Sequence, residues 1–82
     1  MRLHIYKATV YAATGRRVVV AVESDEVSHR ADLYVAVQTV LGGRVGEYRL
    51  HDTTRTIRSK LTGFEPVRNC TTNAQPWAWV KY

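Results

Sequence analysis

The sequence predicts an α+β fold, in which one main helix packs on one face of a small, mostly antiparallel sheet. Three observations support this class: two alternating segments joined by a glycine turn, one long segment with apolar residues at helical spacing, and an alternating segment at the C-terminal end. The predicted order is ββαβ…β. A chain of 82 residues has the size of one domain, so we expect residues 1–82 to form a single domain.

Residues 2–12 and 17–23 alternate between two faces and predict a β-hairpin. The three-residue loop between them places Gly15 at the position that needs a positive φ. We expect the face that carries the valines to be buried, and the face that carries Lys7, Thr9 and Tyr11 to lie opposite. The register predicted from this loop pairs Val10 with Val18, Ala8 with Val20 and Tyr6 with Val22.

Residues 25–41 predict the helix that covers the sheet. Ser24 is the expected N-terminal cap, and the two acidic residues that follow it suit the positive end of the helix dipole. Gly42 and Gly43 are expected to end the helix, because glycine readily adopts a left-handed cap. The apolar stripe expected to face the sheet consists of Val27, Ala31, Leu33, Tyr34, Val37, Val40 and Leu41.

The last half of the chain is less regular. Residues 48–50 predict a short strand, residues 66–76 a long polar loop, and residues 77–82 a final strand. Residues 53–62 fit two structures. Their threonines favour a strand, whereas Asp52 as a cap and the helical spacing of Ile57, Leu61 and Phe64 indicate a possible second short helix, which we slightly prefer.

The net charge of +5 is unevenly distributed. Residues 1–43 hold five Lys/Arg against four Asp/Glu, whereas residues 44–82 hold seven against three. Such an excess suits an anionic partner, although it also serves solubility alone. The single cysteine excludes an internal disulfide, and the first seven residues lack the pattern of a secretory signal, so we expect a cytoplasmic location and no membrane span.

No pattern of residues predicts catalysis or metal binding. His4, His29 and His51 lie on different predicted elements, and no ligand spacing connects them. The glycines at 42, 43 and 46 close a helix, whereas a phosphate-binding loop opens one. Cys70 lacks a neighbouring base and is expected to be a free thiol. We therefore expect no enzymatic activity, no catalytic residues, no cofactor and no metal.

Two groups of residues are candidates for binding a partner. The first is a predicted basic patch, which would contain Arg44, Arg49, Arg55, Arg58 and Lys60. The alternative interpretation of these residues is an ordinary solvated polar face. Trp77 and Trp79 are two residues apart and are expected on one face of the final strand. They either belong to the core, which we prefer, or form an exposed pair beside the basic patch.

These features are typical of small non-enzymatic binding proteins, and no motif identifies a family. In its small size, its Arg-rich composition and its lack of an active-site pattern, the chain is similar to the accessory or inhibitor proteins of phages and mobile elements, which dock on a host protein or nucleoprotein. For a phage-encoded protein the location would be the host cytoplasm. The alternative is a nucleic-acid-binding protein that uses the basic second half, Arg44–Lys60. A homodimer through an exposed edge at the terminal strand is a further expectation, and a small oligomeric enzyme is the least favoured one.

Overall fold

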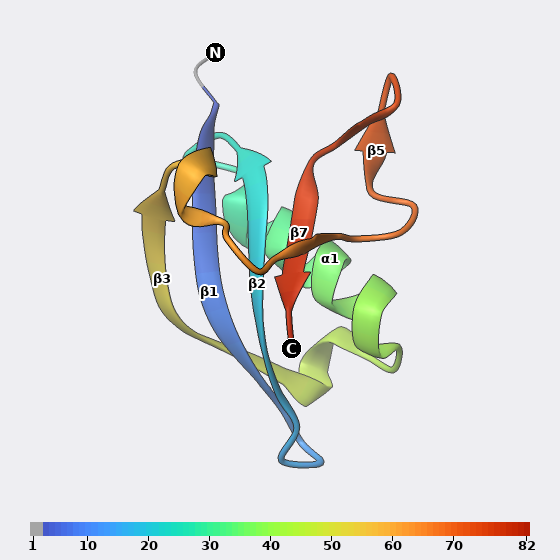
Figure 1. Ribbon diagram of the computed structural model, residues 1–82. Helices are drawn as coiled ribbons and strands as arrows, with labels where there is room; N and C mark the ends of the chain where they lie inside the picture. Colours follow the sequence, from blue (N-terminus) through green and yellow to red (C-terminus); the bar gives the residue numbers. More distant parts are fainter. Residues whose placement is uncertain (1–2) are drawn as a thin grey trace.

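A computed structural model describes residues 3–82 and confirms the α+β class (Figure 1). One α-helix packs against a five-stranded antiparallel sheet with the strand order β3-β1-β2-β7-β4, and β5 and β6 form a separate two-stranded ribbon. The elements are β1 (His4–Ala12), β2 (Arg17–Ser24), α1 (His29–Leu41), η1 (Val45–Glu47), β3 (Tyr48–Thr56), η2 (Arg58–Lys60), β4 (Glu65–Pro66), β5 (Thr71–Thr72), β6 (Gln75–Pro76) and β7 (Ala78–Lys81).

The β1–β2 hairpin has the predicted register. Val10 pairs with Val18, Ala8 with Val20 and Tyr6 with Val22, and all six residues are buried in the core beneath α1. Gly15 has a φ of 87°, as the three-residue loop requires. The alternation of the two strands therefore determined both which residues pair and which face is buried.

The main helix begins at His29, so the prediction of a helix from residue 25 was wrong at this end. The Asp25 carboxylate accepts hydrogen bonds from the backbone N–H groups of Val27 (2.8 Å) and Ser28 (2.7 Å), which form a turn before the helix. These bonds, that of Ser28 foremost, hold the pKa of Asp25 below its ordinary value.

Ser24 is not the helix cap. Its buried hydroxyl donates to the Asp32 carboxylate at 2.6 Å and so connects the end of β2 to the first turn of α1. The apolar stripe is buried at Leu33 and Val37, and the helix ends at Gly42 as predicted, with a φ of 73°. Val27 lies in the preceding turn and is 93% exposed, so it does not belong to the buried face.

The preferred second short helix at residues 53–62 was wrong. β3 continues to Thr56, and only a 3-10 turn, η2, follows it. The open edge of β1 accounts for this outcome, because nearly the whole length of β3 pairs with β1 and tertiary pairing outweighs the local helical spacing. A β-bulge at Asp52, whose φ is 55°, interrupts this pairing and accommodates one extra residue in β3.

The predicted final strand is confirmed as β7, which lies inside the sheet and not at its edge. It pairs with β2, and β4 covers its other side at Trp79 and Val80. The edge strands of the sheet are β3 and the two-residue β4. The terminal strand therefore offers no open edge at these residues for the expected pairing with a second copy. The predicted polar loop, residues 66–76, begins inside β4 and contains the short strands β5 and β6.

Two hydrophobic clusters hold the sheet, one on each face. The larger lies between α1 and the sheet. The smaller lies on the opposite face, where Leu61 and Phe64 cover Ile5, Ala21 and Trp79. Within residues 3–82, no helix is long and apolar enough to span a membrane.

Candidate functional site

The sheet face opposite α1 is covered at only one end. The segment that carries η2 packs over Ile5, Ala21 and Trp79, and it leaves the end near the β1–β2 turn uncovered (Figure 1). Residues that pair directly across antiparallel strands share a face, so the strand registers give the composition of the uncovered part row by row.

The first uncovered row contains Arg49, Tyr11 and Arg17. Tyr11 on β1 pairs with Arg49 on β3 and with Arg17 on β2, so an arginine lies on each side of the tyrosine. Adjacent strands are about 4.8 Å apart, which places the two arginine backbones about 10 Å from each other. All three side chains are exposed to solvent.

The second uncovered row crosses four strands. His51 pairs with Thr9, Thr9 with Val19, and Val19 with Lys81. Lys7 lies in the next row, beside Thr54 of β3 and Ala21 of β2. The bulge in β3 falls between these two rows.

The rings of Tyr11 and His51 lie against each other across the two rows. Their centroids are 5.0 Å apart and their planes meet at 88°, in an edge-to-face arrangement. Tyr11 remains 41% exposed. The pair therefore presents aromatic surface to solvent while each ring restricts the movement of the other.

At the paired positions of these rows every charged residue is basic, and the exposed Asp52 lies in the β3 bulge between the His51 row and the Lys7 row. The one ion pair among residues 3–82 joins Arg58 to Glu23 at 3.4 Å, at the covered end of the face. We name the uncovered surface the basic sheet face and define it by its cationic and aromatic members, Lys7, Tyr11, Arg17, Arg49, His51 and Lys81.

The basic residues predicted from the second half of the chain do not form one patch. Arg49 alone belongs to the basic sheet face. Arg55 pairs with Tyr6 on the opposite face, and its guanidinium donates to His4 Nδ1 at 2.7 Å. Arg58 lies over the Trp79 ring at 5.3 Å, Lys60 is in η2, and Arg44 is in the link between α1 and η1.

The two tryptophans do not share a face, contrary to the expectation from their spacing. β7 begins at Ala78, so Trp77 lies outside the regular alternation and packs against the larger cluster. Trp79 is only 8% exposed and belongs to the smaller cluster. The preferred core interpretation therefore holds for Trp79, and the pair forms no exposed platform.

Comparison with protein-family models, curated protein sequences and solved structures finds no match to this chain. The basic sheet face is therefore interpreted from its own residues. Five of its six members were missed as site residues, although the predicted hairpin register already pairs Tyr11 with Arg17. The position of β3 beside β1, which adds Arg49 and His51, had no local signal.

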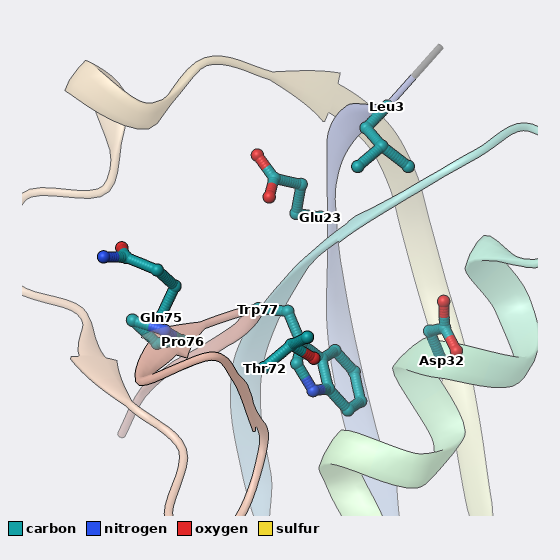
Figure 2. A pocket seen from close by; sticks show the side chains of 7 residues that line it. All are labelled: Leu3, Glu23, Asp32, Thr72, Gln75, Pro76 and Trp77. Atoms are coloured by element: carbon teal, nitrogen blue, oxygen red, sulfur yellow. The ribbon is translucent and has the colours of Figure 1, made fainter. Parts of the chain in front are cut away.

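A cleft of about 410 Å³ lies at the other end of the molecule (Figure 2). Its walls combine the Trp77 ring and two carboxylates with apolar and amide side chains, and Figure 2 shows the ring of Trp77 between Thr72 and α1. Both carboxylates have partners, since Asp32 accepts from Ser24 and Glu23 pairs with Arg58. The lining contains no lysine or arginine, so this cleft does not suit a phosphate.

Among residues 3–82, no three His, Cys, Asp or Glu side chains lie close enough together to hold a metal ion. Cys70 is buried, and burial raises the pKa of its thiol, opposed only by a hydrogen bond with Thr39. Such a cysteine stays protonated near neutral pH and is a poor nucleophile.

Proposed function

We propose that this protein binds nucleic acid through the basic sheet face and has no catalytic role. The observation that carries the proposal is the row in which Arg49 and Arg17 flank Tyr11, on a surface whose paired positions carry four Lys or Arg residues and no acidic residue. Arginine recognises phosphate oxygens with a planar fork of N–H donors, and its charge is permanent. Two more cations, Lys7 and Lys81, extend the same surface.

The spacing of the cations favours a polyanion over a small anion as the ligand. The cations are distributed over β3, β1, β2 and β7 and do not converge on one point. A chain of phosphates can satisfy cations spaced in this way, and it releases one condensed counterion for each phosphate neutralised. The gain in entropy from this release drives binding and makes the affinity depend on salt.

The test is the salt dependence of binding. We expect a labelled oligonucleotide to bind with an affinity that falls linearly on a log–log plot against salt concentration. Replacing Arg17 and Arg49 together by alanine should reduce the slope by about 1.4 to 1.8, since each neutralised phosphate contributes about 0.7 on single strands and 0.9 on duplex DNA. Fluorescence anisotropy at four or more salt concentrations measures the slope.

A matched control removes the same charge elsewhere. Arg30 lies on α1, and Arg68 lines a depression with Thr39 and Val40 of that helix, so both are remote from the basic sheet face. The Arg30→Ala/Arg68→Ala variant should keep the slope of the original protein. Absence of binding at low salt, or an equal loss of slope in both double variants, would refute the proposed interface.

A protein or nucleoprotein partner is the second candidate, and the outer side of α1 favours it. Ala31 and Val35 are exposed and lie four residues apart on one side of the helix, and Val27, which is 93% exposed, lies in the turn just before it. The test is a pull-down with and without nuclease at two salt concentrations. A partner that survives nuclease and high salt but is lost from a Val35→Asp variant would support this function, whereas an unchanged partner would exclude this surface.

A further inference from the structure

We infer that the nucleic acid is single-stranded and that one of its bases stacks on Tyr11 while its phosphates contact Arg17 and Arg49. This inference rests on the proposed function and specifies the ligand class of the same surface. Every base has an aromatic face, so stacking on a protein ring is available to any unpaired base, whereas in a duplex the bases already stack on each other.

The position of Tyr11 supports a stacking role. Tyr11 is 41% exposed, and two arginines flank it in its own row. A cation on each side of an aromatic ring matches a strand whose base lies on the ring and whose phosphates run to either side. His51 packs against the Tyr11 ring in a perpendicular arrangement with centroids 5.0 Å apart, which restricts the ring and lowers the entropy lost when a base stacks.

The shape of the sheet argues against a duplex as the ligand. A major groove about 12 Å wide admits one helix or a two-stranded ribbon. The basic sheet face spans four strands, or about 14 Å between the outer strand axes, before side chains are added. The helix α1 does not suit a major groove either, because Arg30 is its one Lys or Arg and its exposed side carries Ala31 and Val35.

The first measurement compares ligands of equal charge. A twelve-nucleotide single strand, a hairpin duplex with the same number of phosphates, and a strand of abasic nucleotides are titrated into the intact protein. We expect the single strand to bind at least tenfold more tightly than the duplex and the abasic strand. Equal affinities for the three would overturn the stacking inference while leaving the proposed phosphate binding in place.

The second measurement removes the ring without changing charge. Tyr11→Leu should weaken single-strand binding by roughly 5- to 150-fold, the range that corresponds to loss of one base–aromatic stack. Its salt slope and its affinity for the abasic strand should not change, because neither depends on the ring. Tyr11→Phe keeps the ring and should bind within about twofold of the original protein.

The two measurements separate this inference from the proposed function. If Tyr11→Leu binds the single strand like the original protein while Arg17→Ala/Arg49→Ala loses its slope, the surface binds phosphate but not bases. If the duplex binds best, the projecting β1–β2 hairpin, which is narrow enough for a groove, would replace the sheet face as the contact (Figure 1). Absence of any binding would contradict both the proposed function and the inference.

Discussion

Individual side chains at the corner of β1, β3 and α1 show how a buried polar group limits stability. The Tyr6 ring stacks on His29 with centroids 4.1 Å apart and meets His4 edge-on at 6.2 Å. Its hydroxyl is buried and has no hydrogen-bond partner among residues 3–82. A buried hydroxyl without a partner retains the cost of its desolvation.

We therefore expect Tyr6→Phe to stabilise the protein. Removing the hydroxyl keeps both ring contacts and removes a desolvation cost on the order of 1 kcal/mol or more. Urea denaturation followed by circular dichroism would show a higher midpoint with an unchanged slope. Tyr11→Phe is the control, because that residue is exposed and the change should leave the midpoint unaltered. A Tyr6→Phe variant less stable than the original protein would mean that the hydroxyl has a partner in solution.

Among the secondary-structure elements, α1 carries both buried and exposed apolar residues. Val37 is fully buried against the sheet, whereas Val35, two residues earlier, is 47% exposed. Positions two apart on a helix point in different directions, so equal hydrophobicity does not imply equal burial. This mixture of buried and exposed valines explains why the stripe predicted from the sequence was broader than the buried face.

The two valines form a matched pair for testing the packing of the helix. Val37→Asp should unfold the protein, because it buries a charge without a partner. Val35→Asp adds the same residue to the same helix on the solvent side and should change the free energy of unfolding by about 0.5 kcal/mol or less. Thermal melts followed by circular dichroism would distinguish them. A folded Val37→Asp variant would show that α1 does not depend on this contact.

At the scale of the whole molecule, the sheet is a layer between two clusters of unequal size. The smaller cluster packs the segment of Leu61 and Phe64 onto the sheet face opposite α1. The part of that face that this segment does not cover is the basic sheet face. Trp79 belongs to the smaller cluster, and the Arg58 guanidinium lies over its ring at 5.3 Å. The basic sheet face therefore depends on a tryptophan that does not contribute to its surface.

Trp79→Ala should destabilise the whole domain. Truncation of a buried aromatic side chain typically lowers the free energy of unfolding by about 3–5 kcal/mol, a large part of what a domain of this size possesses. Tyr82→Ala is the control, since Tyr82 is 69% exposed and lies just after the same strand. Chemical denaturation would measure both. A Trp79→Ala variant of unchanged stability would mean that the smaller cluster does not hold the fold.

The elements that could be predicted from the sequence are those whose signals lie in neighbouring residues. Alternation and a glycine turn predicted the β1–β2 hairpin and its register. Helical spacing predicted α1, and Gly42 predicted its end. Alternation in the last six residues predicted β7. These signals are local, because strand alternation, helix period and turn conformation are properties of a few consecutive residues. The start of α1 was predicted four residues too early because Asp25, which forms a turn before the helix, is also a residue typical of a helix start.

The order of the strands and the open face of the sheet depend on contacts between residues far apart in the sequence. β3 lies beside β1 because long-range pairing satisfies its backbone and outweighs the helical spacing of residues 53–62. That pairing brings Arg49 and His51 to Tyr11 and sends Arg55 to the other face. The candidate site is thus assembled from residues distant in sequence, whose proximity depends on the strand order of the sheet and not on any local pattern.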